Sequence, residues 1–164
     1  MTTKWASPRR YRPRRREGDK MIYTTFALAH QAGACTDSYR KLARALGGIE
    51  KYGANTPIPL DQIIEVLGLN DAIWAMRCTT TPAENVMIEF SCRCAEHVLV
   101  HFEAFYPEDQ RPRQAIDAAR RCITDKSADW AAWAAAWAAW DASADWAAEK
   151  QWQTGILLSL LQED

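Results

Sequence analysis

The stretch TPAENVMIEFSCRCAEHVLVHFEAFY, residues 81–106, carries the signals that decide the fold class of this chain. Its first four residues, Thr81–Glu84, fit a capping box with proline at the first helical position, and Pro107 predicts where the helix stops. Between these signals, apolar residues recur at three- and four-residue spacing, which predicts one long helix with a broad buried face. The residues of that face are Val86, Phe90, Cys94, Val98 and Phe102, with Met87, Leu99 and Phe105 beside them.

The segments that precede this helix also follow a helical pattern. Thr36 is the predicted N-cap of a helix that Gly47 and Gly48 end, and shorter helices are predicted over residues 59–68 and 70–78. No segment alternates apolar and polar residues as a half-buried strand does. The sequence therefore predicts an all-α fold, a compact multi-helix bundle.

The segment SADWAAWAAAWAAWDASADWAAEKQW, residues 127–152, is built from little besides alanine, tryptophan and carboxylates. Four of its tryptophans form one narrow seam at spacings of three, four and three: Trp130, Trp133, Trp137 and Trp140. Alanine favours the helix and lets neighbouring backbones approach closely. We expect a long Ala/Trp-rich C-terminal helix from Ser127 to about Gln162, with Gly155 as a weak point, lying in a groove between other helices.

The charge of the chain is divided between a short arm and a long body. Residues 1–20 hold eight basic and two acidic side chains, a net of +6, whereas the remaining residues carry a net of −7. We expect residues 1–20 to be a disordered basic arm and residues 21–164 to be a single all-helical domain. Met21 is an alternative start of the protein, which would remove the arm. The arm is a candidate for binding nucleic acid through Arg9, Arg10, Arg12, Arg14, Arg15 and Arg16.

The five cysteines and the hydropathy pattern bear on where the protein resides. An odd number of irregularly spaced cysteines favours reduced thiols in a cytoplasmic protein. The uncharged stretch from Trp130 to Trp140 lies between Asp129 and Asp141 and is too short to cross a bilayer. The sequence therefore predicts a soluble cytoplasmic protein with no membrane partner.

The sequence contains few candidate catalytic or metal-binding residues. Three potential zinc ligands lie near one face of the predicted long helix: Cys94, His97 and His101. Zinc binds cysteine sulfur and histidine nitrogen, but the sequence offers no clear fourth ligand. Cys92 and Cys94 are spaced so that their thiols point apart on a helix. There is no glycine-rich phosphate loop and no nucleophile motif. We therefore predict no enzymatic activity, no metal and no cofactor.

Two groups of residues are candidates for binding a partner protein. Trp146 and Trp152 lie away from the tryptophan seam and are candidate exposed anchors, accompanied by the acidic residues Asp141, Asp145 and Glu149. Arg111 and Arg113 form the second group. Their guanidinium groups either pair with Glu108, Asp109 or Asp117 and tie the loop to a neighbouring helix, which we favour, or face a partner.

Three blocks of the sequence together resemble the family of alanine-rich immunity proteins, which occur beside bacterial toxin systems and in phage genomes. The blocks are PIPLDQIIEVLGLNDAIWAMRC, CAEHVLVHFEAFYPEDQRPRQAIDAARRC and an alanine-aromatic helix ending EKQWQTGILLSLL, and the resemblance covers most of the chain after residue 30. Its most specific part is the pattern matched by Phe102, Glu103, Pro107, Asp109, Arg111, Pro112, Arg113, Ala115, Ile116, Ala118, Ala119 and Arg120.

The resemblance implies a compact helical protein that acts by binding another protein, with no catalytic residues. Residues 1–20 and the tryptophans of the last helix depart from the family pattern. We expect an inhibitor that neutralises a toxin or, for a phage-borne copy, a host defence nuclease complex. The alternative is a nucleic-acid-binding phage accessory protein that uses the arginine arm. The heptad-like tryptophan seam also leaves a homodimer open.

Overall fold

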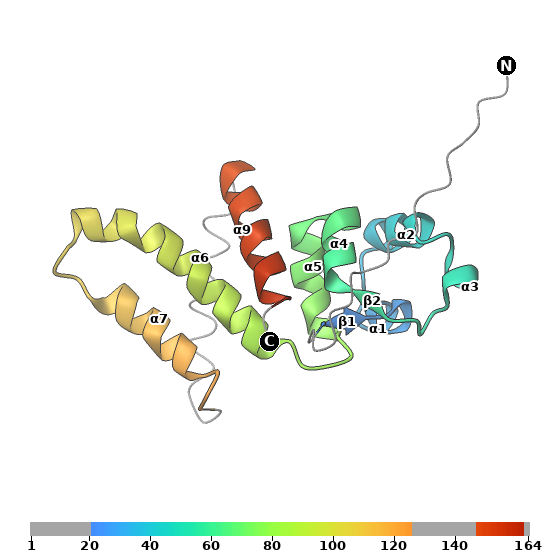
Figure 1. Ribbon diagram of the computed structural model, residues 1–164, viewed down its shortest axis with the longest axis horizontal. Helices are drawn as coiled ribbons and strands as arrows, with labels where there is room; N and C mark the ends of the chain where they lie inside the picture. Colours follow the sequence, from blue (N-terminus) through green and yellow to red (C-terminus); the bar gives the residue numbers. More distant parts are fainter. Residues whose placement is uncertain (1–20, 126–146, 163–164) are drawn as a thin grey trace, which may run out of the picture.

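The computed structural model describes residues 21–125 and 147–162, and its secondary structure is dominated by helices (Figure 1). The helices are α1 (Phe26–Gln31), α2 (Thr36–Ala45), α3 (Ile49–Tyr52), α4 (Leu60–Leu67), α5 (Leu69–Ala75), the 3-10 turn η1 (Met76–Cys78), α6 (Glu84–Phe105), α7 (Arg111–Arg121) and α9 (Ala147–Leu160). The predicted all-α fold is confirmed. The basic arm and most of the predicted Ala/Trp helix lie outside the described residues.

One small element was absent from the sequence prediction: a two-stranded antiparallel ladder of β1 (Tyr23–Thr24) and β2 (Ile58–Pro59). Tyr23 faces Pro59 and Thr24 faces Ile58, and Thr24 also forms a bridge with Thr79. The backbone N–H of Thr80 donates to the carbonyl of Tyr23 at 2.7 Å. A two-residue strand cannot show an alternating pattern, so only tertiary pairing reveals it.

The larger core lies among α1, α2, α4, α5, α9 and one face of α6. Phe26 is fully buried at its centre and packs edge-to-face against Tyr39 and Tyr52, with ring centroids 5.3 and 6.0 Å apart. In α9, Leu157 is fully buried in this core, and the helix runs unbroken through Gly155. Figure 1 shows α9 between α6 and α5, so α9 joins the two ends of the molecule.

Helix α6 buries two faces instead of the single stripe that its sequence predicts. Phe90 and Cys94 belong to the larger core, whereas Cys92 and Leu99 pack with Ile116 of α7 in a second cluster. The thiols of Cys92 and Cys94 therefore point apart, as predicted. The second face was missed because hydrophobic periodicity identifies apolar positions but not the helix that covers each of them.

Two predicted helix starts are wrong by a few residues. Helix α6 begins at Glu84 with Ala83 at the N-cap and no side-chain cap, because Thr81 lies outside the helix and its carbonyl accepts a hydrogen bond from the Thr79 hydroxyl. Helix α2 has Cys35 at its N-cap, and the predicted cap, Thr36, is its first helical residue.

Candidate protein-binding surface

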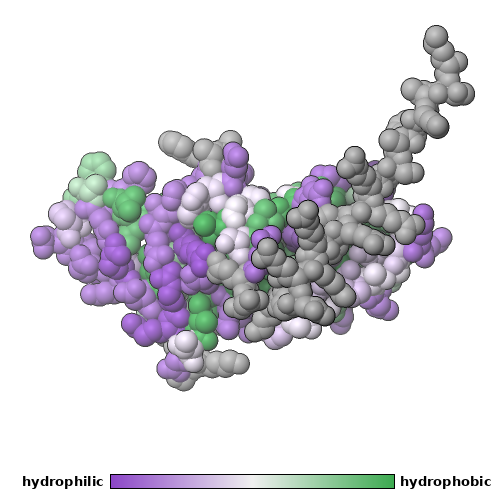
Figure 2. Space-filling view, in the orientation of Figure 1, coloured by the Kyte–Doolittle hydropathy of each residue, from purple (hydrophilic) through white to green (hydrophobic). Residues whose placement is uncertain are grey.

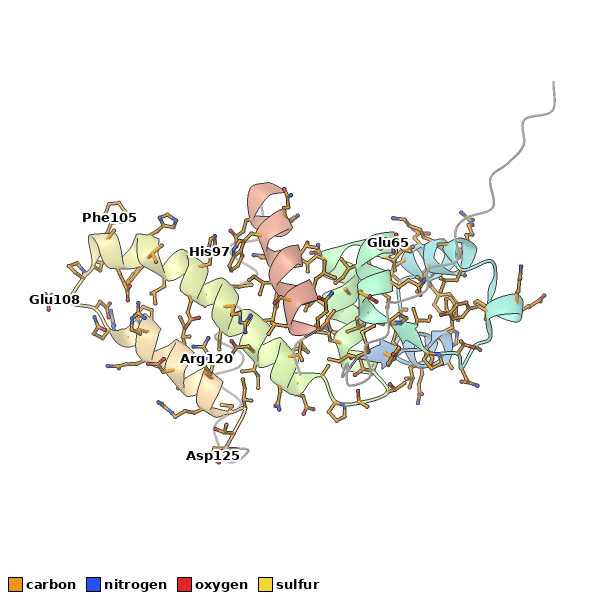
Figure 3. The ribbon with its side chains drawn as sticks, in the orientation of Figure 1. Glu65, His97, Phe105, Glu108, Arg120 and Asp125 are labelled. Carbon is orange, nitrogen blue, oxygen red and sulfur yellow. The ribbon has the colours of Figure 1, made fainter. Side chains whose placement is uncertain are left out.

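Helices α6 and α7 form an antiparallel hairpin that projects from the larger core (Figure 1). Arg120 of α7 ties it together across the helices. Its Nε donates to Glu89 Oε2 at 3.0 Å, while Nη1 and Nη2 donate to the two carboxylate oxygens of Glu96 at 2.7 and 2.9 Å. Figure 3 shows Arg120 between the two helices. Hydrogen bonding from Arg120 lowers the pKa of Glu96, which keeps that carboxylate charged and paired.

Two more ion pairs order the loop end of the hairpin. Arg113 donates to both carboxylate oxygens of Glu103 at 2.8 and 2.7 Å, which joins α7 to α6. Arg111 donates to both oxygens of Asp109 at 2.9 and 2.6 Å and, through its backbone N–H, to Oδ1 at 3.1 Å. These hydrogen bonds lower the pKa of Asp109 to about 2. Arg111 thus pairs with Asp109, one of the predicted partners, but within the loop itself. Arg113 makes the predicted tie to a neighbouring helix, although through Glu103, which the sequence analysis did not name.

The C-terminal part of α6 and its C-cap expose three large apolar side chains, Val100, Phe105 and Tyr106, which we call the apolar tip. They are 58%, 80% and 60% exposed. A green patch marks the corresponding end of the molecule in Figure 2, and Figure 3 shows Phe105 pointing away from the hairpin. Contiguous exposed apolar residues of this kind mark interaction surfaces.

The apolar tip corrects one prediction, because Phe105 was expected beside the buried face of the long helix. Its exposure arises because α7 begins only at Arg111 and packs through Ile116 and Ala119 on the middle of α6. At the final turn of α6, α7 contacts Glu103 through Arg113, and Phe105, two residues further on, lies on the opposite side of the helix. The sequence held a partial signal, since Phe105 and Tyr106 directly precede the breaker Pro107.

Helix α9 contacts α6 through two of the predicted partner-binding residues. The indole of Trp152 stacks on the imidazole of His97, with ring centroids 3.8 Å apart and planes inclined by 16°. A carboxylate oxygen of Glu149 lies 3.3 Å from Nε2 of the same histidine. Trp152 is half-buried, so it is part of an interhelical contact, and its role as an anchor for a partner stays a prediction. Trp146, Asp141 and Asp145 lie outside the described residues, as do all six arginines of the arm.

The three candidate zinc ligands do not converge. Cys94 is buried in the larger core, where desolvation raises the pKa of its thiol to about 12. His97 stacks on Trp152, and His101 is exposed near the apolar tip. Within residues 21–125 and 147–162, no three His, Cys, Asp or Glu side chains are grouped so that they could hold a metal ion. No helix in the same ranges is long and apolar enough to span a membrane.

Comparison with known proteins places the hairpin in a family. Residues 76–154 match the family model described as "Imm-5 like putative immunity protein". The matched segment includes η1, α6, α7 and the first half of α9, and so contains the apolar tip. This match confirms the resemblance to immunity proteins over residues 76–154, whereas residues 57–75 of the first block lie outside it. No curated protein and no solved structure matches the chain.

Proposed function

From the assignment of residues 76–154 to an Imm-5-like immunity family, we propose that the protein neutralises a protein toxin by binding it directly. The observation that carries the proposal is the apolar tip, which is exposed at the end of the hairpin and lies inside the matched segment. For a copy carried by a phage, the corresponding target is a host defence nuclease complex.

The hairpin is suited to inhibit a target protein by binding it, without a catalytic reaction. Four charged side chains near the tip form two ion pairs, Glu103 with Arg113 and Asp109 with Arg111, which hold the turn in shape. Binding then buries preordered aromatic side chains, which commonly dominate the energetics of interfaces. Burial of one such side chain contributes about 1.5–3 kcal/mol before entropy is subtracted. A target whose active surface is covered in this way is inhibited by occlusion, and no catalytic group is required.

Charge favours a basic target. Residues 21–164 carry a net charge of −7, and nucleic-acid-cleaving toxins present basic surfaces to their substrates. Opposite net charges accelerate the diffusional encounter and add specificity more than affinity.

The test is growth rescue in bacteria that express a candidate toxin, combined with co-purification of the two proteins. We expect the wild-type chain to restore growth and to co-purify with the toxin. The double variant Phe105→Ala/Tyr106→Ala removes two exposed rings, of which Tyr106 also packs on Phe102 at the edge of the second cluster, and it should weaken toxin binding by about 100-fold or more. Thermal unfolding verifies that the variant is folded. The matched control is Glu50→Ala/Lys51→Ala on exposed α3, which should rescue growth as well as wild type does.

Full rescue by the tip variant would show that the toxin contacts another surface. Absence of binding by the wild-type chain would contradict the inhibitory function itself.

A second candidate function is nucleic-acid binding through the arm, which the six arginines between residues 9 and 16 favour. Arginines of this density release counterions from a phosphate backbone, so binding would fall steeply with salt concentration. Replacement of the six arginines of the arm in the whole chain separates this function from inhibition.

A further inference from the structure

A cavity of about 260 Å³ lies among α1, α2, α4 and α5, at the opposite end of the molecule from the apolar tip. Every residue that lines it precedes residue 76, so the cavity lies entirely outside the segment that matches the immunity family. Its inner wall is apolar and buried, formed by residues that include Phe26, Leu42, Ile58 and Ile63. A dry cavity of about 150 Å³ is large enough for benzene, so this one has room for a phenyl ring with a short tail.

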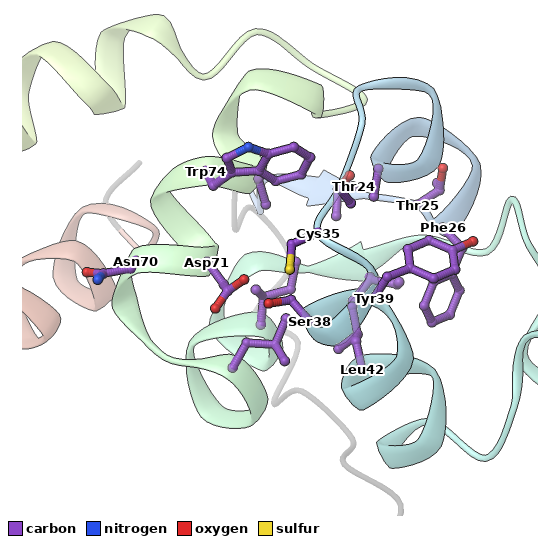
Figure 4. A pocket seen from close by; sticks show the side chains of 16 residues that line it. Thr24, Thr25, Phe26, Cys35, Ser38, Tyr39, Leu42, Asn70, Asp71 and Trp74 are labelled. Atoms are coloured by element: carbon purple, nitrogen blue, oxygen red, sulfur yellow. The ribbon is translucent and has the colours of Figure 1, made fainter.

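The mouth of the cavity has a different chemistry. Trp74 and Tyr39 supply half-buried aromatic rings from α5 and α2, and Asp71 supplies a carboxylate from the first turn of α5 (Figure 4). Asp71 is the only charged side chain among the described residues that line the cavity, and no described residue forms an ion pair with it. The guanidinium of Arg77, which is not part of the lining, lies 5.8 Å from the centroid of the Trp74 ring.

We propose that this cavity binds a small organic cation, namely an amine whose aromatic or aliphatic body enters the apolar interior and whose ammonium group pairs with Asp71. The apolar wall favours the body of such a ligand through desolvation. The Asp71 carboxylate, which forms no ion pair with any described residue, selects a positive head group, and the rings of Trp74 and Tyr39 line the space beside it. A carboxylate ligand of the same shape would meet the negative charge of Asp71 and is excluded.

Cys35 provides a built-in reporter of occupancy. This residue lines the cavity, its thiol is exposed, and Figure 4 shows its side chain in the space between α2 and α5. We expect 2-phenylethylamine at saturating concentration to slow alkylation of Cys35 by iodoacetamide at least fivefold, measured on the full chain by peptide mass. The matched anion 3-phenylpropionate has the same ring and the opposite charge, and should slow the alkylation by less than 1.5-fold.

The role of Asp71 is tested by Asp71→Asn, which keeps the shape of the side chain and removes its charge. This variant should bind 2-phenylethylamine at least tenfold more weakly, when protected and unprotected rates are compared within the same variant. The control Glu65→Gln removes an exposed acidic charge from α4 outside the lining and should bind the amine as wild type does. Titration calorimetry of the same four pairings provides a second readout that does not depend on Cys35.

Equal protection by the amine and the anion, or unchanged amine binding in Asp71→Asn, would overturn the proposal. Absence of calorimetric binding of the amine to the wild-type chain would overturn it as well. Thermal unfolding of each variant verifies that it is folded. The experiment uses no toxin, so its outcome is independent of the proposed inhibitory function.

Discussion

Single residues in this protein differ sharply in reactivity according to their surroundings, and the cysteines show this most clearly. Cys35 is exposed at the N-terminus of α2, where hydrogen bonds from the backbone N–H groups of Ser38 and Asp37 lower the pKa of its thiol. Burial has the opposite effect on Cys92 and Cys94, because desolvation raises the pKa of their thiols to about 11 and about 12. The thiolate is the reactive form, so Cys35 is the nucleophilic member of this set.

Alkylation of the native protein should therefore modify Cys35 first. At pH 8 we expect iodoacetamide to react with Cys35 at least about tenfold faster than with Cys78, Cys92 or Cys94, since a lowered pKa leaves more thiolate at a given pH. The midpoint of the rise of the rate with pH should lie below pH 9, the ordinary thiol pKa, for Cys35 and near pH 11 for Cys92. Peptide mass measured against time gives each rate, and comparable rates at Cys35 and Cys92 would contradict the assignment.

At the scale of secondary-structure elements, the α6–α7 hairpin is held by the guanidinium of Arg120, which donates to the carboxylates of both Glu89 and Glu96. Glu89 accepts hydrogen bonds from Arg120 and also from Arg93 of its own helix, at 3.0 and 2.9 Å. The network is partly exposed, so solvent screens it and its contribution to stability is modest. Its removal nevertheless leaves Glu89 and Glu96 close together without their shared partner.

We expect Arg120→Met to lower the free energy of unfolding by about 1–2 kcal/mol, because the aliphatic part of the side chain is kept while the paired cation is lost. The matched control is Arg121→Met, the exposed neighbour on the same helix, which should change stability by less than about 0.5 kcal/mol. Urea denaturation followed by circular dichroism measures both. Equal effects of the two substitutions would show that the Arg120 network contributes nothing beyond helix propensity.

At the scale of the whole molecule, the basic arm is the candidate for nucleic-acid binding and the acidic body is the candidate for toxin binding. The six arginines of the arm, converted together to glutamine, separate the two candidate functions. Toxin binding through the body should be retained, whereas any nucleic-acid binding should be lost with its salt dependence. Loss of toxin binding in this variant would place the inhibitory contact in the arm.

The charge of the body makes a further prediction about kinetics. The rate constant for association with a basic toxin should fall about tenfold or more between 20 and 300 mM salt, because counterions screen long-range attraction beyond about 10 Å. The dissociation rate should change much less, since apolar contacts at the tip are insensitive to salt. Stopped-flow fluorescence measures both rates. An association rate that is independent of ionic strength would contradict steering by the net charge of −7 on residues 21–164.

The sequence by itself determined the helical fold class and the divergence of Cys92 from Cys94, and it included Asp109 among three possible partners of Arg111. Each of these depends on local spacing along the chain, where helical geometry fixes which atoms are neighbours. It also carried the family resemblance, through motifs concentrated in the hairpin.

Only the tertiary structure decided which helix covers which apolar residue. Phe105 continues the apolar pattern of α6 yet is exposed, because α7 contacts the opposite side of that turn through Arg113 and Glu103. Cys92 is buried because α7 packs over it. The cavity beside Asp71 and Trp74 likewise forms where α1, α2, α4 and α5 meet, from residues spread over fifty positions of the chain. Packing between distant segments is a property of shape complementarity, which periodicity along one helix does not encode.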